Sequence, residues 1–168
     1  MSDKVSTRTA APGDIPAIIE LHARVFGPGR FARSAYRVRE GKRDGGTLSP
    51  FCRVAIRGNR LIASVIFTEV RIGHVAGALL LGPLAVDPEF AGRGFGRQLV
   101  AEGLEEAKTA GRALVLLVGD EPYYARLGFQ RVPPGQITLP GPVNPARLLA
   151  ASLIDGALST ARGLVSAA

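Results

Sequence analysis

Apolar residues along this chain follow two kinds of spacing, and the changes between them predict its elements. Alternating or unbroken apolar runs bounded by turn residues predict strands, whereas apolar residues three and four positions apart predict helices. The predicted strands cover residues 5–10, 51–56, 61–70, 78–86, 113–118 and 129–132. The predicted helices cover residues 15–25, 30–42, 96–110 and 123–127. The unbroken run at 113–118 lies between two predicted helices and is therefore expected to be a buried parallel strand.

Turn residues indicate how these elements connect. The short turn at 57–60 predicts that the strands on either side of it pair as an antiparallel hairpin. Asp14 precedes the first predicted helix and is expected to cap it, and Gly111 is expected to end the third. Residues 159–168 show no pattern that favours either element.

The strand predicted at 78–86 runs directly into a glycine-rich loop and then into a helix. Asp87-Pro88 ends the strand, because proline supplies no N–H and restricts the residue before it. Glycines then follow at every second position, at Gly92, Gly94 and Gly96, and helical spacing begins at once. The first N–H groups of a helix have no partner within it, and the helix dipole leaves that end partly positive, so this order of elements favours an anion.

Two arginines strengthen this interpretation. Arg93 and Arg97 place cations beside those amides, and glycine lets the backbone approach a phosphate closely. The sequence therefore predicts a pyrophosphate site. The dinucleotide fingerprint G-x-G-x-x-G does not fit, because Arg97 stands where its third glycine should fall. A P-loop does not fit either, because Gly96-Arg97-Gln98 is not Gly-Lys-Ser/Thr.

Two motifs resemble those of one known family. Residues 91–96, Ala-Gly-Arg-Gly-Phe-Gly, resemble the acetyl-CoA motif Q/R-x-x-G-x-G/A of the GNAT acyltransferases except at Ala91, which replaces Gln or Arg. Residues 124–129, Tyr-Ala-Arg-Leu-Gly-Phe, are similar to the Y-x-x-x-G-F segment that these enzymes carry after their fifth strand. The motifs occur in the family's order, and the resemblance covers nearly the whole chain. Residues 118–124, with the Pro-Gly-Pro at 140–142, resemble the YhbS-type predicted N-acetyltransferase subgroup.

The resemblance implies a fold of the α/β (α+β) class, the GNAT acyl-CoA N-acyltransferase fold. Its mixed central sheet has about seven strands and roughly four helices, and it is splayed between strands 4 and 5. Residues 1–168 would form a single domain of this kind. Residues 147–154 favour a helix by propensity alone, but the resemblance implies a strand there that pairs with the one after Phe129.

The resemblance further implies an N-acetyltransferase that moves an acetyl group from acetyl-CoA to a primary amine by direct attack. Backbone groups of Leu84, Ala85 and Val86 would bind the pantetheine arm. The pyrophosphate would be held by amides of Gly92, Arg93, Gly94, Phe95, Gly96 and Arg97. A small-molecule or peptide amine would be the acceptor.

Catalytic roles are also implied by position in the motifs. Tyr124 would give a proton to the departing thiolate, because it stands four residues before Gly128. Tyr123 next to it is expected in the core or in the wall of the substrate site. For the base that takes the amine proton, Glu69 at the end of the third strand is ranked first. The other candidates are His74, Glu20 and His22.

Charge and composition leave alternatives open. The 168 residues carry 21 Lys and Arg against 14 Asp and Glu, a net charge of +7 that suits CoA and would also suit nucleic acid. The basic residues are dispersed apart from 30–43 and Arg93 with Arg97, so nucleic acid stays an unsupported partner. Two alternatives to an acetyltransferase of small-molecule or peptide amines remain. One is a tRNA-directed acetyltransferase, and the other is a catalytically silent CoA-binding sensor or interaction module.

The remaining composition excludes other classes. The single Cys52 excludes an internal disulfide and a cysteine-based metal site, and with two histidines far apart no metal is predicted. Cys52 itself is expected to be a small buried residue. The polar N-terminus and the lack of an apolar run of bilayer length predict a cytoplasmic protein without a membrane partner. A homodimer stays open.

Overall fold

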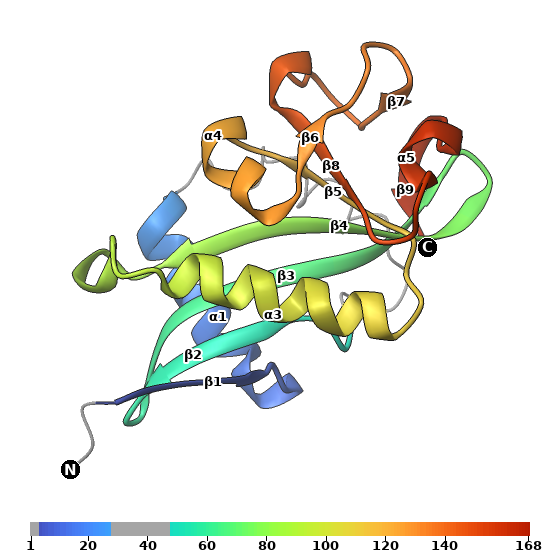
Figure 1. Ribbon diagram of the computed structural model, residues 1–168. Coiled ribbons are helices and arrows are strands. Elements are labelled where there is room, and N and C mark those ends of the chain that lie inside the picture. Colours follow the sequence, from blue (N-terminus) through green and yellow to red (C-terminus); the bar gives the residue numbers. More distant parts are fainter. Residues whose placement is uncertain (1–3, 28–47) are drawn as a thin grey trace.

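The computed structural model describes residues 4–27 and 48–168 (Figure 1). The helix predicted at 30–42 and the basic cluster at 30–43 lie outside these described residues. Within the described ranges, none of the helices combines the length and apolar character needed to span a bilayer.

The apolar runs form one mixed sheet, and its main path is β1-β2-β3-β4-β5-β8-β6. These seven strands are β1 Val5–Thr9, β2 Arg53–Arg57, β3 Arg60–Ile72, β4 Val75–Val86, β5 Leu114–Val118, β6 Gln130–Arg131 and β8 Leu148–Ser152. Neighbours on this path are antiparallel except for β4 and β5, which are parallel. The mixed sheet, the hairpin of β2 and β3, and the parallel β5 were predicted from the sequence and are confirmed.

The last part of the chain supplies one strand within this path and two strands off it. Residues 148–152 form β8 between β5 and β6, so tertiary pairing overrides the helical propensity of the Ala and Leu residues there. The strand implied by the family resemblance is therefore confirmed. Residues 163–167, where the apolar spacing predicts nothing, form β9, which pairs with the far end of β3 and with the short β7 (Ile137–Thr138).

Helices cover both faces of the sheet. The α-helices in the described residues are α1 Ile15–Phe26, α3 Phe95–Thr109, α4 Glu121–Tyr124 and α5 Ala157–Thr160. In Figure 1, α3 crosses in front of β2 and β3, whereas α1 lies behind them. Apolar side chains of α3, including Leu99 and Val100, pack with Phe67 and Leu79, and Ile18 of α1 packs in a separate cluster against the opposite face.

The expectation that Asp14 caps the first helix is wrong. Its carboxylate makes no capping hydrogen bond to α1. Instead it accepts hydrogen bonds from both terminal nitrogens of Arg8, at 2.6 and 2.8 Å, and from the Ala11 N–H at 2.7 Å. The hydrogen bond from Arg8 is the main reason that the pKa of Asp14 lies below its usual value. This acid therefore ties β1 to the turn before the helix. Cys52, by contrast, is fully buried, as predicted.

Gly103 allows α3 to lie close to the sheet, and this contact yields a prediction. A Cβ on Gly103 would lie 2.7 Å from Cζ of Phe67, whose side chain is fully buried, and 3.3 Å from the Phe51 carbonyl oxygen. Overpacking costs about 1–3 kcal/mol, which exceeds the roughly 1 kcal/mol that alanine gains over glycine in a helix. Gly103→Ala is therefore expected to lower the unfolding free energy by up to about 2 kcal/mol, measured by urea denaturation.

Gly13→Ala is the matched control for this substitution. Nothing lies within 4 Å of a Cβ at Gly13, and its φ is not in the left-handed region. Its urea midpoint should stay close to that of the wild type. Equal midpoints for the two variants would contradict the close contact between Gly103 and Phe67.

Candidate active site

The site begins where β4 loses its neighbour. β4 pairs with β3 as far as Val86, opposite Ala63, but its parallel pairing with β5 covers only Ala78 to Leu80. From residue 81 to residue 86, no described strand lies against the β5 side of β4. The sheet is therefore splayed between these strands. Backbone groups of Leu84 and Val86 face the open edge, whereas Ala85, opposite Ser64, is in register to pair with β3.

Side chains on this open edge alternate between the two faces of the sheet. Leu84 and Val86 pack with the core cluster under α3, and Ala85 packs with the cluster under α1. This is the period of two that a strand requires. The backbone edge itself therefore faces neither layer of helices.

A glycine loop then leads from the end of β4 to α3. Gly92 and Gly94 have φ of +77° and +84°, in the left-handed region that glycine adopts without strain. The Gln98 N–H donates to the Gly94 carbonyl at 3.0 Å, which is the first bond of the helix. The N–H groups of Phe95, Gly96 and Arg97 have no acceptor among the described residues. Unpaired N–H groups at the start of a helix are the donors that the predicted anion site requires.

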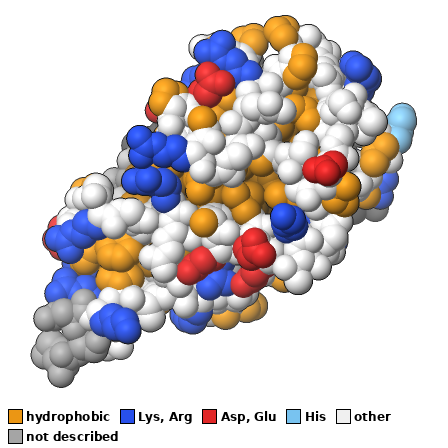
Figure 2. All heavy atoms as spheres, viewed as in Figure 1, with side chains coloured by type: hydrophobic (Ala, Val, Ile, Leu, Met, Phe, Trp, Pro, Cys, Tyr) orange, Lys and Arg blue, Asp and Glu red, His pale blue; other side chains and the backbone are white. Residues whose placement is uncertain are grey.

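Arginines near this loop leave it positively charged. Arg93 lies over the ring of Phe90, 5.3 Å from its centroid, and Arg97 is close enough to Tyr123 to influence its pKa. Within residues 4–27 and 48–168, neither arginine is ion-paired with a carboxylate. On the face seen in Figure 2, basic side chains gather at the left, where the loop and the first turn of α3 lie.

The buried side chain of Asp87 fixes the start of the loop. Its carboxylate, 2% exposed, accepts hydrogen bonds from Arg24 of α1 at 2.6 Å and from Arg60 of β3 at 2.8 Å. It also accepts one from the Glu89 N–H at 3.0 Å. Burial acts to raise the pKa of Asp87, but these three hydrogen bonds outweigh it and hold the pKa below its usual value. Asp87 therefore joins α1 and β3 to the start of the glycine loop.

Two adjacent tyrosines complete the site from α4. The ring of Tyr124 packs edge-on against Phe129, 5.7 Å between centroids, and lies over Gly119, where a Cβ would be 3.1 Å from Cδ2 of Tyr124. The Tyr123 hydroxyl lies beside Gly96 in the first turn of α3. Burial raises the pKa of Tyr123, and the charge of Arg97 opposes that rise in part. The motif singles out Tyr124 alone, and nothing in its spacing points to the position of the Tyr123 hydroxyl.

Glu69 is not brought to this site. It lies opposite Leu79, where β4 is still paired with β5, and its carboxylate accepts a hydrogen bond from Nε of Arg112 at 2.9 Å. Leu79 precedes Leu84 by five residues, which is on the order of 15 Å along a strand. Glu69 therefore lies away from the open edge of β4, in an ion pair with Arg112.

The other candidate bases are spread over the fold. His74 is exposed in the turn between β3 and β4, and Glu20 is exposed on α1, 3.8 Å from Arg24. His22 is 2% exposed on α1. They therefore lie on two different elements, and of the three only His22 is buried.

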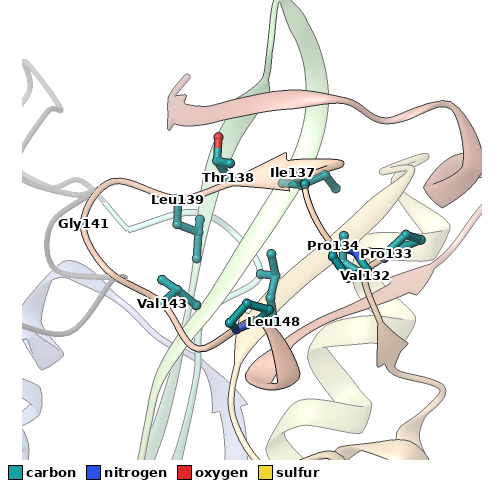
Figure 3. Close-up of a pocket in the computed structure, with 11 residues that line it drawn as sticks. Val132, Pro133, Pro134, Ile137, Thr138, Leu139, Gly141, Val143 and Leu148 are labelled. Carbon is teal, nitrogen blue, oxygen red and sulfur yellow. The ribbon is translucent and has the colours of Figure 1, made fainter.

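A separate cavity of about 170 Å³ lies between the segment after β6 and the start of β8 (Figure 3). Leu139, Val143 and Leu148 point toward one another across it, and Thr138 points away. No titratable side chain lines this cavity. It therefore offers apolar volume but no acid, base or nucleophile.

The open strand edge and the helix terminus beside it define an acyl-CoA transferase of the kind that the motifs implied. The family model for the acetyltransferase (GNAT) domain matches residues 6–132. The chain therefore belongs to the GNAT acetyltransferase family, and its mixed sheet is the GNAT fold.

Particular relatives are similar over nearly the whole chain. The chain is 31% identical over 159 residues to the uncharacterized N-acetyltransferase YhbS of Escherichia coli strain K12, covering 94% of this chain and 93% of that protein. The crystal structure of Escherichia coli YhbS in complex with CoA is similar at a TM-score of 0.83, with 29% identity, over 100% of this chain and 92% of that one. A GNAT acetyltransferase from Brucella melitensis in complex with acetyl-CoA is similar at a TM-score of 0.65, with 25% identity, over 89% and 96% of the two chains.

Proposed function

We propose that this protein transfers the acetyl group of acetyl-CoA directly to a primary amine of a small molecule or peptide. The observation that carries this proposal is the open edge of β4, which leads straight into the unpaired amides at the start of α3. An extended arm with amide groups fits the edge, and a diphosphate fits the helix terminus. The residues present therefore fit acetyl-CoA.

In this proposal, backbone groups of the chain bind acetyl-CoA and a side chain donates the proton. Backbone groups of residues 84–86 bind the pantetheine arm, and the amides from Gly92 to Arg97 hold the diphosphate. An N–H near Val86 polarises the thioester carbonyl as charge develops on its oxygen. Bound acetyl-CoA supplies the activated acyl group, whose bond to sulfur breaks as the bond to the amine nitrogen forms. Tyr124 then donates its phenolic proton to the thiolate.

The acid and base roles differ in how far the structure supports them. Tyr124 lies beside the open end of the sheet, because α4 follows β5 directly. Four carboxylates on the glycine loop and at the start of α4 are each paired with an arginine. These acids are Asp87, Glu89, Asp120 and Glu121. This proposal assigns the amine proton to none of them, and solvent accepts it.

Binding and turnover are tested separately. Acetyl-CoA at 100 times its Kd is expected to stabilise the protein by about 2.7 kcal/mol, seen as a rise in Tm. A panel of amines is then screened for release of free CoA thiol, with acetyl-CoA and no amine as the background. Thiol release with one class of amine supports the transferase. A Tm rise without thiol release across the panel would identify a CoA-binding module, and no Tm rise would overturn the proposal.

A further inference from the structure

Three side chains meet at one point in the site, the first turn of α3 at Gly96. A Cβ on Gly96 would lie 3.0 Å from the hydroxyl oxygen of Tyr123, 3.3 Å from Cγ2 of Val86 and 3.5 Å from Cδ2 of Leu84. Val86 and Leu84 come from the open edge of β4, and Tyr123 comes from α4. The phenol of Tyr123 therefore reaches across to the place where the open edge and the helix terminus meet.

The Tyr123 hydroxyl is a hydrogen-bond donor for which the described residues supply no acceptor. Its residue is 39% exposed, and in the described part of the chain this hydroxyl donates to no protein group. Its pKa lies above the ordinary value, because burial disfavours the phenolate, so it keeps its proton at neutral pH. The amide of Gly96 beside it is also an unpaired donor.

These groups together select one kind of ligand atom. The hydroxyl, the helix amides and the guanidinium of Arg97 can all donate a hydrogen bond. Of these groups, only the phenol oxygen can also accept one. An oxygen that carries negative charge satisfies them best, since hydrogen bonds to ionised acceptors are the strongest. In the cofactor that fits this site, the group with such oxygens is the diphosphate.

We propose that Tyr123 is a cofactor-binding residue whose hydroxyl donates a hydrogen bond to a non-bridging oxygen of the acetyl-CoA diphosphate. This inference rests on the proposed function. The two adjacent tyrosines then have different roles: Tyr123 binds the diphosphate, and Tyr124 donates a proton to the thiolate sulfur. The bare α-carbon of Gly96 leaves room for the hydroxyl beside the amides.

The first test compares Tyr123→Phe with Tyr124→Phe, which removes the neighbouring hydroxyl instead. Binding of acetyl-CoA and of ADP, which carries a diphosphate but no pantetheine, is measured by calorimetry. Tyr123→Phe is expected to weaken both ligands about tenfold or more, as loss of a hydrogen bond to a charged group does. In turnover assays this loss appears in the KM for acetyl-CoA rather than in kcat. The affinities of Tyr124→Phe should match the wild type.

A double-mutant cycle with Gly96→Ala tests the contact itself. In the wild type the added methyl group would lie 3.0 Å from the hydroxyl oxygen and must displace it, which weakens ADP binding. In the Tyr123→Phe background there is no hydroxyl to displace, so the same methyl group should cost less. The two effects should therefore be less than additive, as expected for residues in contact.

Failure of the inference can be told from failure of the proposed function. If the wild-type protein does not bind acetyl-CoA, both the inference about Tyr123 and the proposed function are wrong. Wild type that binds and turns over, with Tyr123→Phe unchanged in affinity and KM, would overturn the inference alone. Weaker acetyl-CoA binding with unchanged ADP binding would place the hydroxyl on the pantetheine arm, and would overturn it as well. A fall in Tm without a change in either affinity would reduce Tyr123 to a structural role.

Discussion

Replacing Tyr124 by phenylalanine is expected to lower kcat by about 10²–10⁴-fold, the usual contribution of a positioned general acid. The ring remains, so its edge-on contact with Phe129 and its close fit over Gly119 are kept. Acetyl-CoA affinity and Tm should therefore stay near those of the wild type. The measurement is steady-state thiol release with the acceptor amine at saturating acetyl-CoA.

A pH series sharpens this result. Protonation of the acceptor amine slows wild type and Tyr124→Phe alike as the pH falls. Because the thiolate in Tyr124→Phe must take its proton from solvent, the ratio of its rate to the wild-type rate should rise as the pH falls. A variant that turns over at the wild-type rate with the correct amine would remove Tyr124 from the mechanism. Loss of acetyl-CoA binding would instead show that the hydroxyl supports the site.

Replacing Asp87 by alanine is expected to cost about 2–3 kcal/mol of unfolding free energy, because charged hydrogen bonds to Arg24, Arg60 and the Glu89 N–H are lost. Both arginines are nearly half exposed, so water screens what remains. For a chain of this length the change corresponds to a fall in Tm of roughly 4–12 °C. Asp87→Asn should cost less, because its side-chain oxygen still accepts from the Glu89 N–H.

The sign of the pH dependence follows from the lowered pKa of Asp87. A carboxyl whose pKa is lower in the folded state stabilises the protein fully above its unfolded value of about 3.9. That contribution is lost as the pH falls below this value, through the folded pKa. The gap between wild type and Asp87→Asn, measured by urea denaturation, should therefore be constant from pH 7 to pH 5 and shrink in acid. A gap that widens in acid would contradict the ion pairs.

The sequence predicts the centre of the site because its signals are local. A strand, a proline stop, alternate glycines and a helix lie within about twenty residues, and each is readable from residue type and spacing. The pairing that opens the edge at Leu84 is consistent with the resemblance. Residues 148–152 show the limit of propensity: pairing with two strands makes them β8.

Long-range register explains what sequence reasoning missed. Glu69 lies within β3, but only the pairing of β3 with β4 sets how far along the sheet it lies, and only the fold brings Arg112 to it. Asp14 has the position of a helix cap, yet its carboxylate accepts a hydrogen bond from Arg8 of the preceding strand instead. The placement of the Tyr123 hydroxyl depends on how α4 meets α3, which no local pattern encodes.

The three-residue pairing between β4 and β5 also bears on rigidity. Beyond Leu80 the two strands exchange no backbone hydrogen bonds, so the halves of the sheet are held mainly by packed side chains. Under the proposed function, a pantetheine arm stretched along β4 would take the place of the absent strand. Acetyl-CoA would then be part of the architecture as well as the reagent, and the protein would become stiffer when it binds and looser when CoA leaves.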